Sequence, residues 1–110
     1  MLYSQKMEEI NQAKIEKEIG KIKEEILKIG DMRSGSLTRQ YQNRKNKKGG
    51  YWSLSYTSKM RSHTEAVRPE HLKETGRQIA QYKKFKKLTT RWIDLARELC
   101  RLKLKGKSKL

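Results

Sequence analysis

The sequence predicts an α+β fold, with an N-terminal helix, a three-stranded antiparallel β-meander and a long C-terminal helix. Three observations lead to this prediction. Isoleucines recur with helical spacing near the N-terminus, β-branched and aromatic residues gather in the middle, and a leucine-rich stripe of helical period follows the single proline. The 110 residues suit a single domain covering 1–110. Because only 34% of them are hydrophobic, we expect narrow apolar seams rather than a thick core.

The first element is a helix over residues 4–29, followed by Gly30 at the position of a C-terminal cap. Its isoleucines alternate steps of four and three residues, which is heptad spacing: Ile15, Ile19, Ile22, Ile26 and Ile29. The remaining faces carry mostly Glu and Lys, so this helix needs a partner seam to be stable.

The second element is a sheet over residues 36–67, made of the segments SLTRQYQ, YWSLSYT and RSHTEAV. A long turn over residues 43–50 joins the first two segments, and a short turn over residues 58–60 joins the last two. Successive side chains of a strand point to opposite faces. The central segment therefore has a face that we expect to be buried, with Trp52, Leu54 and Tyr56, and a polar face that stays free, with Tyr51, Ser53, Ser55 and Thr57.

The third element is a helix over residues 69–104, followed by a basic tail over residues 105–110. Pro69 suits the first helical position, and Glu70 suits the first turn. A heptad seam begins at Phe85. We expect the two helices to pair in coiled-coil fashion, within one chain or between chains, and we favour a homodimer. The residues expected at this oligomerisation seam are Ile15, Ile19, Ile22, Ile26, Leu95 and Leu99.

The charge is strongly positive and unevenly distributed. The net charge is +16, of which residues 1–30 contribute nothing, residues 31–64 contribute +7 and residues 65–110 contribute +9. Such asymmetry predicts an anionic partner for the later part of the chain. Nucleic acid is the first candidate and an anionic membrane surface is the second.

The sequence gives little sign of an enzyme or of a cofactor. Cys100 is the single cysteine, so an intrachain disulfide is excluded, and His63 and His71 lack neighbours at metal-ligand spacing. The glycine-rich phosphate-loop motif is absent. We therefore expect no enzymatic activity, no metal and no cofactor. No apolar run is long enough for a membrane span or a signal peptide, and we expect a cytoplasmic, nucleoid-associated protein of prokaryotic or viral origin.

The strongest functional signal is the basic run between the first two strands, next to small polar strand residues. Lys and Arg side chains neutralise phosphates, and Ser and Thr side chains let a sheet approach base edges. A solvated loop in a basic protein is the competing interpretation. The expected nucleic-acid contacts are Arg39, Arg44, Lys45, Lys47, Lys48, Ser53, Ser55, Thr57, Lys59 and Arg61.

Three stretches carry a resemblance: GSLTRQY from Gly35, GYWSLSYT from Gly50 and VRPE from Val67. Over about residues 31–100, the chain resembles an uncharacterised prokaryotic family, a domain of unknown function. Its members read GSL-x-x-x-Y, a cysteine-bearing turn, GPYWYLSY, VP and a long helix. The chain lacks the cysteines of that turn and has basic residues there instead, so the resemblance implies no metal-stabilised turn and no established activity. The order of elements also resembles the AP2-like domains of plant transcription factors and the N-terminal domains of phage-type integrases, which implies DNA binding by analogy of architecture.

These observations lead to two functional hypotheses. The first is a small basic DNA-binding protein from a mobile element or phage, which contacts duplex DNA, with RNA as an alternative ligand, through its sheet and the 43–50 turn. The second is a coiled-coil adaptor that dimerises or recruits a protein partner, in which the contacts with nucleic acid are secondary.

Overall fold

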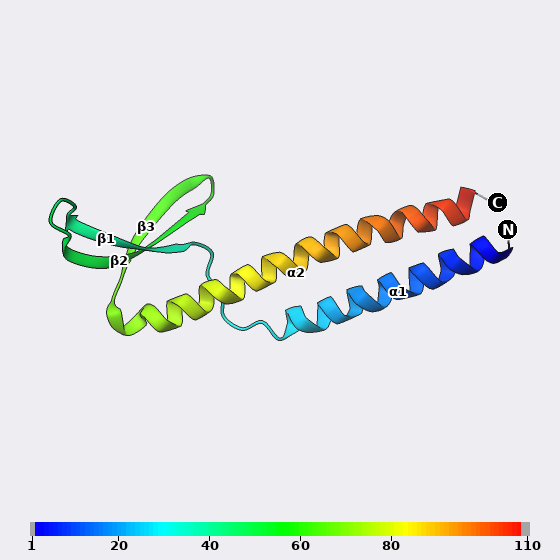
Figure 1. Cartoon of the computed structure of the whole chain (residues 1–110), viewed down its shortest axis with the longest axis horizontal. Helices are drawn as coiled ribbons and strands as arrows, with labels where there is room; N and C mark the ends of the chain where they lie inside the picture. Colours follow the sequence, from blue (N-terminus) through cyan, green and yellow to red (C-terminus); the bar gives the residue numbers. More distant parts are fainter. Residues whose placement is uncertain (1, 109–110) are drawn as a thin grey trace. The chain divides into compact units, whose positions relative to one another are not determined.

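The computed structural model describes residues 2–108, and for residues 2–6 and 106–108 it describes the backbone alone. The element order is α1 (Leu2–Leu27), β1 (Ser36–Asn43), β2 (Lys48–Ser58), β3 (Arg61–Val67) and α2 (Pro69–Ser108). This confirms the α+β class and the predicted order of elements (Figure 1). The chain divides into a helical unit, made of residues 1–29 and 85–110, and a sheet unit, made of residues 30–84, so that α2 contributes to both.

Several boundaries differ from the prediction, beginning with α1, which covers Leu2–Leu27 rather than residues 4–29. β2 begins at Lys48, so the predicted eight-residue turn shortens to residues 44–47. The glycines at 49 and 50 belong to the strand because a cross-strand pair, Asn43 with Lys48, continues the ladder to that point. α2 continues to Ser108, so residues 105–108 of the predicted tail are helical, and residues 109–110 lie outside the described residues. Lysines in a last turn favour helix because they interact well with its dipole.

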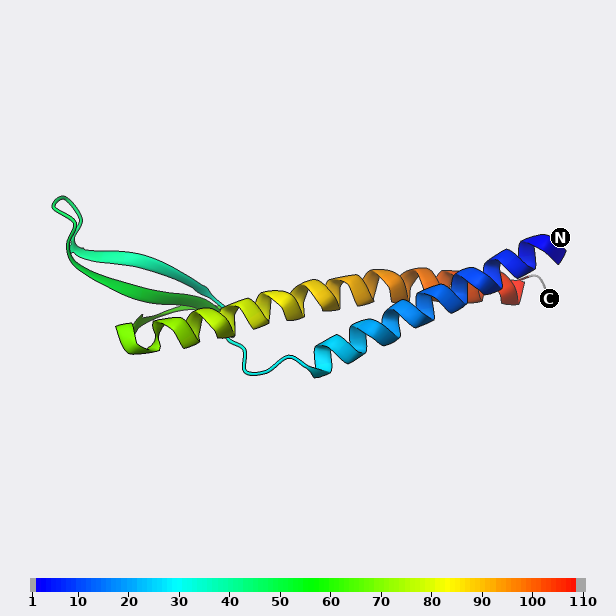
Figure 2. The ribbon, with the colours of Figure 1, turned by 60° about the horizontal axis from the view of Figure 1, so that its bottom comes forward.

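In the helical unit, α1 runs antiparallel to the later part of α2, and Figures 1 and 2 show the two lying alongside each other. The predicted seams meet within one chain: the buried core is Ile15, Ile19, Ile22 and Leu95. Partly buried apolar residues pack against it: Ile26, Leu88, Trp92, Leu99 and Leu102. Polar contacts flank the core, since Arg91 Nη2 lies 3.2 Å from Glu18 Oε1 and Lys23 Nζ lies 5.2 Å from the ring centre of Trp92.

In the sheet unit, the strand order is β1-β2-β3 and both pairs are antiparallel. Cross-strand partners fix two faces. One face, which we call the covered face, carries Leu37, Arg39, Tyr41, Trp52, Leu54, Tyr56, His63, Glu65 and Val67. The opposite face, which we call the open face, carries Ser36, Thr38, Gln40, Tyr51, Ser53, Ser55, Thr57, Ser62, Thr64 and Ala66.

The covered face is closed off by residues 32–35 and by the first part of α2. Arg33 links the segment 32–35 to both α2 and β3. Its backbone N–H donates to the Gln78 carbonyl in α2 at 3.2 Å, and its Nη2 pairs with Glu65 Oε2 in β3 at 3.2 Å. Leu54 is buried here, as are Thr75 and Ile79 of α2. Trp52 and Tyr56 are half-buried, so Leu54 alone of the three expected core residues of β2 is fully enclosed.

Glycine is required where residues 32–35 approach the sheet. Gly35 has a φ of +133°, and a Cβ at this position would lie 2.7 Å from the Ser55 carbonyl oxygen and 2.9 Å from Leu54 Cδ1. Any side chain would therefore combine a disfavoured backbone conformation with a collision. The absence of a side chain lets the chain cross the sheet directly over Leu54.

Candidate nucleic-acid interface

The open face is a surface of small hydroxyl side chains. Four cross-strand pairs on it join hydroxyl residues: Ser36 with Ser55, Thr38 with Ser53, Ser55 with Thr64 and Thr57 with Ser62. The remaining members are Gln40, Tyr51 and Ala66, so no member of this face is charged. Most members are exposed, and Gln40 is half-buried. The Ser and Thr members of this face offer hydrogen-bond donors and acceptors on short side chains, which let a partner approach the strands.

Ser53 lies at the centre of the open face and has a distinct environment. It lies between Thr38 and Ala66 across the sheet, and it has 0% exposure. Its Oγ has no hydrogen-bond partner among the described residues. A buried hydroxyl without a partner costs stability, so this position is a weak point of the sheet.

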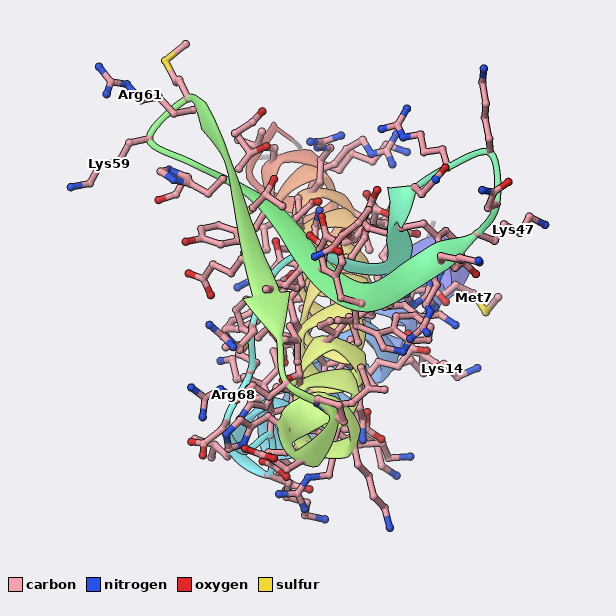
Figure 3. The ribbon with its side chains drawn as sticks, turned by 90° about the vertical axis from the view of Figure 1, so that its left-hand side faces the viewer. Met7, Lys14, Lys47, Lys59, Arg61 and Arg68 are labelled. Carbon is pink, nitrogen blue, oxygen red and sulfur yellow. The ribbon has the colours of Figure 1, made fainter. Side chains whose placement is uncertain are left out.

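The turn between β1 and β2 carries a cluster of cations, which we call the basic turn: Arg44, Lys45, Lys47 and Lys48. Asn43 fixes its shape, because the Asn43 Oδ1 accepts from the backbone N–H groups of Lys45 at 3.2 Å and of Asn46 at 3.3 Å. Lys47 has a φ of 51°, and Gly49 has a φ of 68°. The charges are therefore held on an ordered turn, and Figure 3 shows Lys47 at the outer edge of this turn.

The turn between β2 and β3 lies at the opposite end of β2 and is also cationic. Lys59 and Met60 are its two central residues, with φ values of 51° and 65°. Ser58 and Arg61 close the ladder below them. Figure 3 shows Lys59 and Arg61 projecting outward from this turn. The open face thus has cations at both ends of its central strand and none within it.

The structure brings six of the ten expected nucleic-acid contacts to the open face or to the turns at its ends. Ser55 and Thr57 are exposed on the open face, whereas Ser53, which was expected to stay free, is buried there. Arg44, Lys45 and Lys47 lie in the turn at one end of it and Lys59 in the turn at the other. Lys48 and Arg61 lie opposite Asn43 and Ser58 and so have the phase of the covered face. Sequence reasoning left Ser62 and Thr64 of β3 out of the set, although alternation in RSHTEAV places them in phase with each other.

Arg39 lies on the other side of the sheet. It pairs with Trp52 on the covered face, and its Cζ lies 5.7 Å from the Trp52 ring centre and 5.8 Å from the Tyr41 ring centre. A Cβ at Gly50 would come within 2.5 Å of Arg39 Nη2, so the guanidinium lies against the backbone of β2. Stacking on aromatic rings accounts for this cation, which is separated from the open face by the sheet itself.

A polar network on the covered face has a structural role. Glu65 accepts from the Tyr56 phenol at 2.9 Å and from Arg33 Nη2 at 3.2 Å. The hydrogen bond to Glu65 raises the pKa of Tyr56 above its ordinary value of 10.0, and the Tyr56 ring stacks on His63 at 5.1 Å. Because Arg33 also bonds to α2, this network ties β2 and β3 to the segment that precedes β1.

The part of the chain that the structure describes contains neither a cluster of metal-ligating side chains nor a membrane-spanning helix. Across it, no cluster of three His, Cys, Asp or Glu side chains has the arrangement needed to hold a metal ion. Neither α1 nor α2, as far as each is described, has an apolar stretch suited to crossing a bilayer.

The residues expected at an oligomerisation seam lie in the helical unit. Ile15, Ile19, Ile22 and Leu95 are buried in it, and Ile26 and Leu99 pack against them within the same chain. Coiled-coil packing and a homodimer stay predictions. Comparison with known proteins adds no relative: no family model, no curated protein and no solved structure matches this chain.

Proposed function

We propose that this protein binds duplex DNA with the open face of its sheet, held in place by the basic turn and by the cations of the β2–β3 turn. One observation carries the proposal: a face of seven Ser and Thr residues, free of charged members, has cationic turns at both ends of its central strand. Phosphate contacts supply affinity, and contacts with base edges supply specificity.

The dimensions of the sheet are compatible with the major groove. Three strands at a spacing of about 4.8 Å put the axes of β1 and β3 roughly 10 Å apart, and the groove is about 12 Å wide. The 11 residues of β2 span about 35 Å when extended at roughly 3.3 Å per residue, an upper limit in a twisted sheet. The two cationic turns are therefore far enough apart to meet different phosphates while the hydroxyl face between them lies against the bases.

The side chains of the open face suit direct contact with bases. Ser and Thr hydroxyls donate or accept, and a glutamine amide can bond two atoms of an adenine edge. Gln40 is an amide at the middle of β1 on this face, and Gln42 follows it in the same phase. The Nε2 of Gln40 donates to Thr38 Oγ1 at 3.2 Å. Binding to an adenine would require Gln40 to exchange that bond for bonds to the base.

The test is a fluorescence-anisotropy titration of a labelled duplex over a series of salt concentrations. Replacement of Arg44, Lys45, Lys47 and Lys48 by Ala removes four phosphate contacts, so the slope of log K against log salt falls in magnitude by about 3 to 4, at roughly 0.9 per contact. The matched control removes the same charge from exposed positions of α1 and of the residue that follows it: Lys14, Lys17 and Lys21 in α1, and Lys28, changed to Ala.

An equal loss of affinity in both quadruple variants would show that net charge alone matters, and the basic turn would be removed from the proposal. The open face is tested separately by Ser55→Glu, which places a carboxylate among the hydroxyls and is expected to abolish binding by repelling phosphate. Asn11→Glu adds the same charge to an exposed position of α1 and is expected to change affinity little. Unchanged binding by Ser55→Glu would refute contact through this face.

The second candidate function is an adaptor that acts through the helical unit. The observation in its favour is that α2 exposes Ile93 and Leu104, at 57% and 67% of their surface, outside the core that it shares with α1. A second copy of the chain is the proposed occupant, in keeping with the predicted homodimer. Sedimentation equilibrium at tens of micromolar distinguishes a monomer from a homodimer. A monomer mass would exclude an adaptor that acts by self-association.

A further inference from the structure

The tip of the β2–β3 hairpin carries the most exposed large apolar side chain among the described residues. Met60 exposes 99% of its surface. Lys59 precedes it and Arg61 follows it, and both project outward from the turn in Figure 3. An apolar group therefore stands between two cations, at the end of a sheet whose open face lacks charge.

Neither the backbone nor packing explains a methionine at this position. Two consecutive residues with positive φ form the kind of two-residue hairpin turn that favours Asn-Gly, because such residues adopt this conformation with least strain. Lys59 and Met60 both have side chains that disfavour it, with φ values of 51° and 65°. Single exposed apolar residues are ordinary on protein surfaces. However, Met32 and Tyr51, the other exposed large apolar residues of the sheet unit, still have more than half of their surface covered.

We propose that Met60 is a wedge that inserts between adjacent base pairs of the bound duplex, while Lys59 and Arg61 bind phosphates on either side of that step. This inference rests on the proposed DNA binding. Apolar side chains, methionine among them, are used by proteins that contact the minor groove to unstack a base step and kink the duplex by about 20–90°. Met60 would enter its step from the minor groove that adjoins the end of the site covered by the open face. The unbranched, polarizable thioether of methionine adapts to such a gap.

Duplex DNA fits this tip better than a lipid surface does. The residues next to the turn on the open face are Thr57 and Ser62, so Met60 has no apolar neighbour there to deepen an insertion into a bilayer. A base step needs one apolar group of small cross-section, with cations within reach of the backbone. The tip supplies one methionine and two cations in three consecutive residues.

The experiment measures bending of a duplex that carries a donor and an acceptor fluorophore at its two ends, together with the fluorescence of 2-aminopurine placed at successive steps. Wild-type protein is expected to bring the ends closer and to raise 2-aminopurine emission at one step. Met60→Gly removes the wedge and relieves the positive φ, so it keeps the hairpin folded, as a thermal melt checks. Met60→Leu keeps an apolar side chain that, like methionine, is not branched at Cβ, and it serves as the matched control.

Met60→Gly is expected to lose both signals while still binding the duplex through the basic turn, and Met60→Leu is expected to keep both. Bending by Met60→Gly equal to that of wild type would overturn the wedge and leave the proposed DNA binding intact. Failure of wild-type protein to bind the duplex at low salt would overturn both. Vesicles of anionic and neutral phospholipid provide the remaining arm: Met60-dependent co-sedimentation with them, together with Met60-independent DNA bending, would assign the tip to a membrane and overturn the wedge.

Discussion

Leu54→Ala is expected to unfold much of the sheet unit and to leave the helical unit largely intact. Leu54 lies in the central strand with 1% of its surface exposed. Among the described residues of the sheet unit, Ile79 is the only other buried apolar residue. The backbone of Gly35 lies directly against the Leu54 side chain, since a Cβ at Gly35 would come within 2.9 Å of Leu54 Cδ1. Truncation would therefore leave a gap beneath residues that have little other support.

The size of the effect follows from the buried carbons. Leu→Ala removes three carbon atoms, or roughly 2.4 kcal/mol at about 0.8 kcal/mol each, and the cavity that remains brings the cost to about 3 kcal/mol. The sheet unit has about 55 residues, for which a stability of roughly 3–8 kcal/mol is ordinary. The variant would lose between a third and all of it, equivalent to a fall in melting temperature of about 12–24 °C.

Each unit contains one tryptophan, and this allows the two to be followed separately. Trp52 lies in the sheet unit and Trp92 in the helical unit. Fluorescence during urea unfolding, in backgrounds with Trp52→Phe or Trp92→Phe, would report each unit. Leu27→Ala is the control because Leu27 is 84% exposed. A loss below about 1 kcal/mol for Leu54→Ala, within the range of ordinary surface substitutions and small repacking, would contradict the assignment of Leu54 to the core.

Three further predictions test other parts of the chain. Ser53→Ala should raise the free energy of unfolding by about 1 kcal/mol because it removes a buried hydroxyl without a partner. A lower free energy of unfolding in urea would contradict this and mean that the Oγ is hydrogen-bonded. The raised pKa of Tyr56 means that the contribution of its hydrogen bond to Glu65 is complete below pH 10.0 and is lost as the pH rises through the raised value. Unfolding measured on both sides of pH 10.0 should therefore show an alkaline loss that Tyr56→Phe lacks, and identical profiles would contradict this. Ile19→Asp and Leu95→Asp should each abolish the unfolding transition reported by Trp92, whereas Ile93→Asp, at an exposed position of the same helix, should preserve it, and equal behaviour of all three would show that the core is placed wrongly.

The elements of the fold were accessible from the sequence because each has a strong local signal. Heptad spacing of isoleucines marks α1, and Pro69 marks the first residue of α2. The alternation in β2 placed Leu54 and Ser53 on opposite faces correctly, since a period of two residues leaves only two choices of phase. The prediction that Ser53 stays free was wrong, because neighbouring strands bury it at the centre of the sheet. The end of α2 was placed too early because a cluster of lysines indicates a tail as readily as a last helical turn.

The partner of a seam is harder to predict than the seam itself. The isoleucines of α1 need an apolar stripe on another helix to bury them. The sequence does not distinguish a stripe on the same chain from the identical stripe on a second copy. In the structure the stripe is Leu88, Trp92, Leu95, Leu99 and Leu102 of the same chain. A homodimer therefore has to use residues beyond this core or exchange α1 between chains, and the heptad pattern is the same in both cases.

The misplacement of Arg39 has a physical cause that also bears on function. Alternation assigns faces within one strand, but it relates two strands only when their register is known. The register that pairs Asn43 with Lys48 also pairs Arg39 with Trp52 and Thr38 with Ser53. A shift by one residue would have placed Arg39 among the hydroxyls, where its charge would bind phosphate at the middle of the sheet. With Arg39 on the covered face, the open face has no central cation. In the proposed complex with DNA, charge would therefore act at the ends of β2, and selection among base sequences would depend on the hydroxyl and amide groups between them.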